Sequence, residues 1–162
     1  MYLLDANVFI QAKNLHYRFA TFPCFWDWLN EHNASGHLAS TTLIQKELAS
    51  GNDELAQWAN AAQATWFISE HDRDTQRAFR DIAAWVSSHP RYKGHAKQTF
   101  LAAGDPWLIA KAITLHATVV THEKSAPESV KKIFIPDVCQ YFEVPHLDTY
   151  DLLERMNACF AS

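Results

Sequence analysis

Four acidic residues stand where strands and helices are expected to end or begin. Asp5 directly follows a short apolar run, and Glu123 lies just beyond a second one, Thr118–Thr121. Asp105 opens a helical stretch, and Glu47 lies within another. Because ligands in open parallel sheets bind beyond the carboxyl ends of the strands, these carboxylates are expected to meet in one cleft although they are far apart in sequence.

Such a group of carboxylates favours a divalent metal. Carboxylates repel one another and are costly to bury without a partner, and Mg²⁺ and Mn²⁺ prefer oxygen ligands. A metal held in this way can activate water and orient a phosphate, which is the chemistry of phosphodiester hydrolysis. Asn7 and Thr121 are expected to support the carboxylates or metal-bound waters. Helix capping by Asn7 and the strand propensity of Thr121 explain these two residues equally well.

Each acid also has an ordinary explanation. Asp105 can be a helix N-cap that stabilises the fold by about 1 kcal/mol. Glu47 can be a solvated helix residue, and Glu123 can be a loop acid. Asp5 is the hardest to explain in this way, because an acid that ends a buried strand needs a partner. The coincidence of all four at one expected edge favours a functional site.

Short apolar strands alternate with helical stretches along the chain. The expected strands are residues 1–4, 37–39, 65–69, 118–121 and 133–135. The expected helices are residues 9–15, 21–33, a segment capped by Ser40 or Thr41 that stops at Gly51, and residues 53–63, 72–88, 98–103, 105–116, 136–142 and 148–159. This alternation predicts an α/β fold with a mostly parallel sheet covered on both faces.

Composition limits the class of protein. The 162 residues, 48% of them hydrophobic, predict one domain over residues 1–162. No apolar run approaches the roughly 20 residues of a membrane span, and we expect a cytoplasmic protein. Cysteine and histidine spacing does not match a zinc site. The net charge of −4 argues mildly against a nucleic-acid partner, but residues 82–104 contain no acid and form a local basic stretch.

Three segments resemble the motifs of PIN-domain ribonucleases. Residues 3–10, LLDANVFI, resemble the opening strand motif, and Lys46-Glu47-Leu48 resembles the intermediate acidic motif. Residues 105–112, DPWLIAKA, followed by VVTHE at 119–123, resemble the second half of the domain. The order and spacing match over most of the chain. Two features depart from the family pattern: Glu123 stands where many members have Asp, and residues 72–104 add helical material.

This resemblance implies a three-layer α/β/α PIN-like fold and Mg²⁺- or Mn²⁺-dependent endoribonuclease activity. It implies that Asp5, Glu47, Asp105 and Glu123 are the catalytic metal ligands, with Asn7 and Thr121 in support. Many small bacterial members are toxins of type II toxin–antitoxin pairs, so the resemblance also implies an RNA substrate, an antitoxin partner and a homodimer. Lys93, Lys97 and Lys124 are candidates to hold RNA phosphates.

Two other functions remain open at the level of sequence. A non-catalytic PIN-like module that binds RNA or protein would keep the fold and the acids without cleavage. A phosphatase of the haloacid-dehalogenase type also places Asp after its first strand, but it normally needs a second acid at the position held here by Asn7. The six tryptophans are better explained by core packing than by base stacking.

Overall fold

A parallel sheet forms the centre of the fold. The computed structural model describes residues 1–160, and in this part of the chain the strands are β1 (Tyr2–Leu4), β2 (Leu38–Thr41), β3 (Phe67–Ile68), β4 (Thr118–Val120) and β5 (His146–Leu147). Their order across the sheet is β3-β2-β1-β4-β5, and every neighbouring pair is parallel. The expected α/β class is therefore confirmed.

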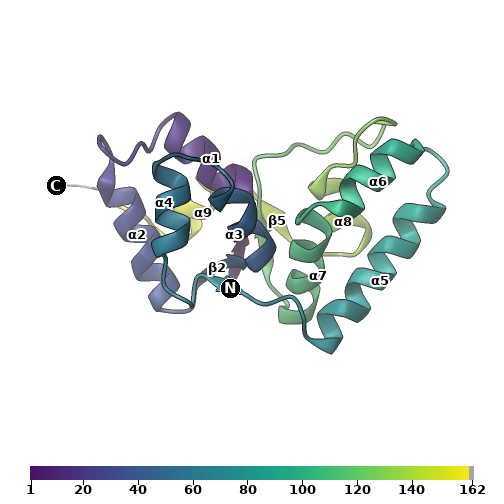
Figure 1. Cartoon of the computed structure of the whole chain (residues 1–162), viewed down its shortest axis with the longest axis horizontal. Coiled ribbons are helices and arrows are strands. Elements are labelled where there is room, and N and C mark those ends of the chain that lie inside the picture. Colours follow the sequence, from purple (N-terminus) through teal and green to yellow (C-terminus); the bar gives the residue numbers. More distant parts are fainter. Residues whose placement is uncertain (161–162) are drawn as a thin grey trace.

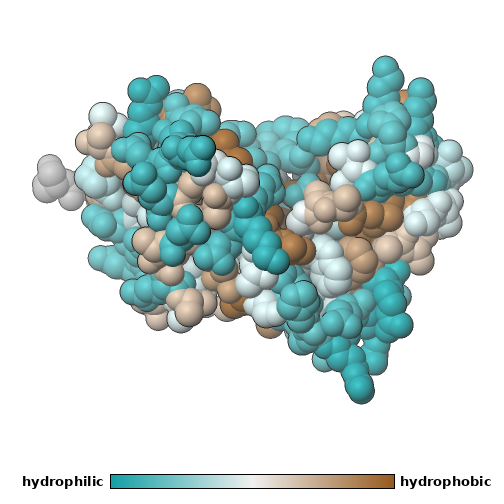
Figure 2. All heavy atoms as spheres, in the orientation of Figure 1, coloured by the Kyte–Doolittle hydropathy of each residue, from teal (hydrophilic) through white to brown (hydrophobic). Residues whose placement is uncertain are grey.

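Helices cover the sheet in two groups. The helices are α1 (Ala6–Asn14), α2 (Pro23–Ala34), α3 (Thr42–Ala49), α4 (Glu54–Ala61), α5 (Arg73–Ser88), α6 (Gly94–Ala102), α7 (Asp105–Leu115), α8 (Ile135–Tyr141) and α9 (Thr149–Arg155). Figure 1 shows α1 to α4 and α9 on one side of the molecule and α5 to α8 on the other, with the strands between them. The outline of the molecule is notched between these two groups (Figure 2).

The two central strands are buried because helices cover both of their faces. Leu3, Leu4, Val119 and Val120 have no exposed surface, as expected for the near-continuous apolar runs of parallel strands. The register pairs Leu3 with Val119 and Leu4 with Val120. Continuing that register by one residue brings the end of β1 beside the end of β4, and polar residues follow both strands at the same edge.

Helix α7 connects the sheet to the second group of helices. It packs against β2 and β4, and α5 packs along it. At its start, a Cβ atom on Gly104 would lie 3.1 Å from Ile44 Cδ1, so the missing side chain lets the beginning of α7 approach α3 closely. An ion pair of 2.7 Å between Lys111 Nζ and Asp72 Oδ2 ties α7 to the N-cap of α5.

One expected strand is absent and one strand was not expected. Residues 133–134 form no strand, and α8 already begins at Ile135. Ile133 and Ile135 are buried in the core. A short apolar run is typical both of a buried strand and of a loop that packs on the core, so the sequence pattern does not distinguish the two. The unexpected strand is β5, a two-residue strand after Pro145 that is too short to show a pattern.

Helix ends differ from the expected bounds by several residues. Helix α1 begins at Ala6 directly after β1, α6 begins at Gly94, and α9 ends at Arg155. Such ends depend on caps and tertiary contacts more than on periodicity. Within residues 1–160, none of the helices combines the length and the hydropathy needed to cross a membrane.

Candidate active site

Asp5 lies at the centre of the carboxyl edge of the sheet. It follows β1, the middle strand, and its residue is only 3% exposed. Burial, together with repulsion from Asp105 and Glu123, raises the pKa of the Asp5 carboxyl to about 8, although the hydrogen bond from Thr121 lowers it. Within the described residues Asp5 has no ion-pair partner. The site therefore holds a buried carboxyl that lacks a cation.

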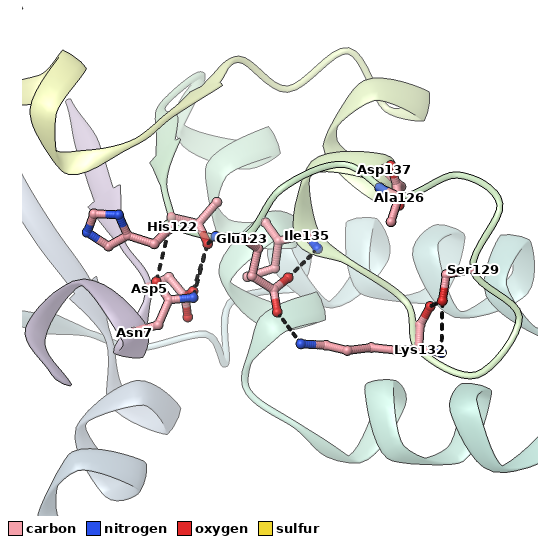
Figure 3. Close-up of polar contacts among 10 residues, drawn as sticks. Asp5, Asn7, His122, Glu123, Ala126, Ser129, Lys132, Ile135 and Asp137 are labelled. Atoms are coloured by element: carbon pink, nitrogen blue, oxygen red, sulfur yellow. Dashed lines mark hydrogen bonds and ion pairs between the residues drawn. The ribbon is translucent and has the colours of Figure 1, made fainter. Parts of the chain in front are cut away.

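Thr121 and Asn7 hold this carboxyl in place. The Thr121 hydroxyl donates to Asp5 Oδ2 at 2.9 Å and accepts from the Glu123 backbone N–H at 3.1 Å. Asn7 Nδ2 donates to the same hydroxyl at 3.3 Å, and Asn7 Oδ1 accepts from the His122 backbone N–H at 3.0 Å. Asn7 lies inside α1, not at its cap position. Its amide thus joins α1 to the segment after β4, as Figure 3 shows.

Asp105 is the first residue of α7. The N-cap position belongs to Gly104, and no side chain caps the helix there, so the N-cap explanation of Asp105 does not hold. Burial, together with repulsion from Glu123 and Glu47, raises the pKa of the Asp105 carboxyl to about 6, and Lys132 acts in the opposite direction. The carboxyls of Glu123 and Glu47 therefore lie close enough to Asp105 to repel it electrostatically.

Glu47 is carried by α3 and is the most exposed of the four acids. Partial desolvation raises the pKa of its carboxyl. Helix α3 is anchored by a residue outside the predicted site: the Glu70 carboxylate accepts from Thr42 Oγ1 at 2.6 Å and from the Leu43 backbone N–H at 2.7 Å. The Thr41 hydroxyl, expected to cap this helix, is buried without a hydrogen-bond partner among the described residues.

Glu123 points away from Asp5 toward the loop before α8. Lys132 Nζ donates to Glu123 Oε1 at 2.7 Å, and the backbone N–H of Ile135 donates to Oε2 at 2.8 Å (Figure 3). Both carboxylate oxygens are thus engaged, one by a cation and the other by the first turn of α8. Glu123 belongs to the same electrostatic cluster, but its side chain bridges toward a different element.

The four acids have the right chemistry for a hard divalent cation. Their donors are all oxygens, and Asp5 is a buried carboxyl without a cation, a combination that is unfavourable unless the charge is neutralised. Within residues 1–160, however, no three His, Cys, Asp or Glu side chains lie close enough together to hold a metal. Glu123 contributes to the separation of the acids, because its carboxylate is bound to Lys132. The residues fit Mg²⁺ or Mn²⁺ by the chemistry of their oxygen donors.

The lysines predicted to contact RNA lie at three separate places. Lys93 occupies the N-cap position of α6 and is exposed. Lys97 Nζ donates to the Ser87 carbonyl at 2.8 Å. Lys124 Nζ lies 3.2 Å from Asp148 Oδ2. Lys132, which contacts the acid cluster directly, belongs to a basic stretch visible in the sequence, but spacing alone did not single it out.

Sequence comparison places the chain in a family. Residues 2–160 match the model of the family described as "Domain of unknown function (DUF4411)". The chain belongs to this family. No curated protein matches the sequence.

Solved structures show the same fold. The structure of VapBC2 from Rickettsia felis bound to a DNA fragment from their promoter matches with a TM-score of 0.54 at 13% identity, over 91% of this chain and 97% of that one. FitAcB from Neisseria gonorrhoeae matches with a TM-score of 0.55 at 15% identity, over 93% and 99%. FitAB bound to the IR36 DNA fragment matches with a TM-score of 0.55 at 14% identity, over 91% and 94%. The PIN-like α/β/α fold is thereby confirmed.

Proposed function

We propose that this chain is a metal-dependent endoribonuclease that hydrolyses RNA phosphodiester bonds and acts as the toxin of a type II toxin–antitoxin pair. The observation that carries the proposal is Asp5, a buried carboxyl that is repelled by Asp105 and Glu123 and pairs with no cationic side chain of residues 1–160. The PIN-like fold and the similarity to VapBC2 and FitAcB support it.

Each side chain has a defined part in this proposal. Asp5, Asp105 and Glu47 would hold Mg²⁺ or Mn²⁺ directly, and Glu123 with Thr121 and Asn7 would assist through waters or a second ion. A bound cation of this kind supplies activated water and neutralises charge on the phosphate. Thr121 orients the Asp5 carboxyl by its hydrogen bond of 2.9 Å. No side-chain nucleophile is required.

The proposed partners follow from the same comparison. Two of the similar structures are complexes bound to DNA fragments. For this chain we propose an RNA substrate, an antitoxin that inhibits it, and a homodimer as the active form. Light scattering of the purified protein tests the last point: a mass near one chain, 18.5 kDa, at all concentrations would contradict the dimer.

The central test is cleavage of RNA by the purified protein with Mn²⁺ or Mg²⁺, compared with EDTA. Asp5→Asn and Asp105→Asn each remove one carboxylate of the cluster, and Asp81→Asn, on the exposed face of α5, is the matched control. We expect cleavage that needs metal, falls at least about 100-fold in the two cluster variants because they lose a metal ligand, and persists in the control. Equal cleavage by all proteins would indicate a contaminant and contradict the assignment.

A non-catalytic PIN-like module is the second candidate. It is favoured by the spread of the acids, since no three of them approach metal-binding distance in the described part of the chain, and by the engagement of Glu123 with Lys132. Calorimetric metal binding without cleavage of any of a varied set of RNAs would favour this module over the nuclease.

A further inference from the structure

A cavity of about 110 Å³ opens beside Asp105, between α6 and the segment that precedes α8. Its volume is well above the roughly 10–15 Å³ that one ordered water needs. One wall is formed by small and apolar residues of α6 and its C-cap, namely Ala96, Thr99, Phe100 and Ala103. The facing wall is residues 131–133, which include Lys131 and Lys132. We call this space the lysine cavity.

The charge of the lysine cavity suits an anion. Lys132 Nζ lies 2.7 Å from Glu123 Oε1 and 4.6 Å from the centre of the Phe134 ring, and its side chain is 57% exposed. Lys131 is exposed and forms no ion pair with residues 1–160. The lining carries two lysines against one acid, Asp105, and its other residues are uncharged. This balance favours a ligand that carries negative charge next to an uncharged body.

A second cavity on the other side of Glu123 has the opposite character. It measures about 210 Å³ and is lined by Glu123, Asp148 and Asp151, with Lys124 as its lysine. That lysine is already paired with Asp148 at 3.2 Å. An anionic ligand would be repelled there, so of these two cavities beside the acid cluster the lysine cavity is the one suited to a phosphate.

We propose that the lysine cavity binds one phosphate–ribose unit of the substrate RNA, next to the bond that is cut. Lys131 and Lys132 contact the phosphate, and the α6 wall packs against the sugar. The proposal rests on the proposed function, because it takes the RNA strand to continue toward Asp105, which also lines the cavity. A cationic peptide would meet the two lysines and is disfavoured by charge.

Lys132 gives the lysine cavity a link to the acid cluster. Its ammonium already satisfies one Glu123 oxygen, as Figure 3 shows. A phosphate in the cavity competes with Glu123 for this ammonium, so bound RNA leaves that carboxylate freer to turn toward Asp5 and Asp105. Lys131 has no such contact, and its substitution is expected to affect RNA binding alone.

The test measures binding of a short fluorescein-labelled single-stranded RNA by anisotropy in EDTA, where the proposed cleavage cannot occur. Lys131→Gln and Lys132→Gln each remove one positive charge. Thr99→Phe fills the cavity without changing its charge. Arg155→Gln, at an exposed position of α9, is the matched control for the loss of a positive charge. We expect each lysine variant to bind about 3–10-fold more weakly, with a salt slope lower by about 0.7 for each lost contact. Thr99→Phe is expected to weaken binding with the slope unchanged, and Arg155→Gln to bind like the wild type.

The outcomes separate this proposal from the proposed function. Weaker RNA binding by the lysine and Thr99 variants, in a protein that never cleaves RNA, would support the lysine cavity and contradict the nuclease. Metal-dependent cleavage together with unchanged RNA binding and unchanged salt slope in all three variants would overturn the lysine cavity while the nuclease stands. Absence of measurable RNA binding by the wild-type protein would also overturn the lysine cavity.

Discussion

Thr121 is the residue on which the geometry around Asp5 depends most. Its hydroxyl donates to the Asp5 carboxyl and accepts from Asn7 Nδ2 and from the Glu123 backbone N–H. One oxygen atom therefore joins β1, α1 and the segment after β4. Since the residue is 2% exposed, water cannot readily replace these contacts.

Replacing Thr121 with Val keeps the shape of the side chain and removes its hydroxyl. We expect the free energy of unfolding to fall by about 1–3 kcal/mol, because Asp5 loses a donor and Asn7 an acceptor in a buried place. RNA cleavage is expected to fall at least about tenfold, because Asp5 loses its orientation. Urea unfolding and a cleavage assay measure the two effects.

Thr118→Val, on β4 shortly before Thr121, is the matched control, because Thr118 is only partly buried and its hydroxyl forms no hydrogen bond with the acids in residues 1–160. A Thr121→Val variant as active as this control would show that the hydroxyl does not position Asp5.

At the scale of elements, α3 and α7 bring their acids together through contacts outside the acid cluster. The close approach of Gly104 to Ile44 sets the start of α7 against α3. Glu70, which follows β3, holds the amino end of α3 by two hydrogen bonds. The position of Glu47 relative to Asp105 therefore depends on a buried carboxylate that takes no part in the cluster itself.

Glu70→Ala is expected to destabilise the protein by about 1–3 kcal/mol, because the first turn of α3 loses the carboxylate that accepts from it and two partly buried donors are left unpaired. Because α3 carries Glu47, we also expect weaker binding of Mn²⁺ by calorimetry. Glu70→Gln keeps one acceptor oxygen and should recover part of both losses. Glu54→Gln, exposed in the first turn of α4, controls for the loss of a helix-terminal charge. Full Mn²⁺ affinity in Glu70→Ala would show that α3 holds its place without the cap.

At the scale of the whole molecule, the acid cluster opposes folding when metal is absent. Asp5 and Glu47 come from the part of the chain that includes α1 to α4, and Asp105 and Glu123 come from the part that includes α7 and β4. Folding therefore brings like charges from distant segments together at one edge of the sheet. Burial is the first cause of the raised pKa values of Asp5 and Asp105, and repulsion among these acids is the second.

This cluster predicts how stability depends on pH. The pKa of Asp5 rises from its ordinary value of 3.8 to about 8 on folding, so over that range the folded state binds more protons than the unfolded state. The free energy of unfolding of the metal-free protein is therefore expected to fall as pH rises from about 4 to about 8. Asp5→Asn removes the part of this dependence that comes from Asp5, while Asp105 keeps its own part. The variant should be more stable than the wild type at pH 8 by about 1–3 kcal/mol.

Urea unfolding in EDTA at several pH values measures this dependence, with Asp81→Asn as the control. A pH dependence that is the same in Asp5→Asn and in the wild type would show that Asp5 is ionised in the folded protein without a cation.

The sequence was sufficient to predict the α/β class and the edge at which the acids gather. Asp5 and Thr121 each follow a short apolar strand, and in parallel strands a residue at the carboxyl end has a fixed place on the sheet edge. This rule does not depend on the conformation of the loops. The positions of Asp5 and Thr121, and of the neighbouring Asn7, could therefore be predicted from the order and spacing of the motifs in the sequence. The PIN-like fold followed from the same motifs.

Tertiary structure alone decided which groups contact the acids. Glu70 reaches α3 from 27 positions away, and Lys132 reaches Glu123 from a loop next to residues 133–135, where the sequence predicted a strand. Neither contact has a periodic or local signature, because each depends on how loops bring distant segments together. The direction of the Glu123 side chain and the presence of the lysine cavity depend on the same packing, since side chains turn toward partners that only the folded chain provides.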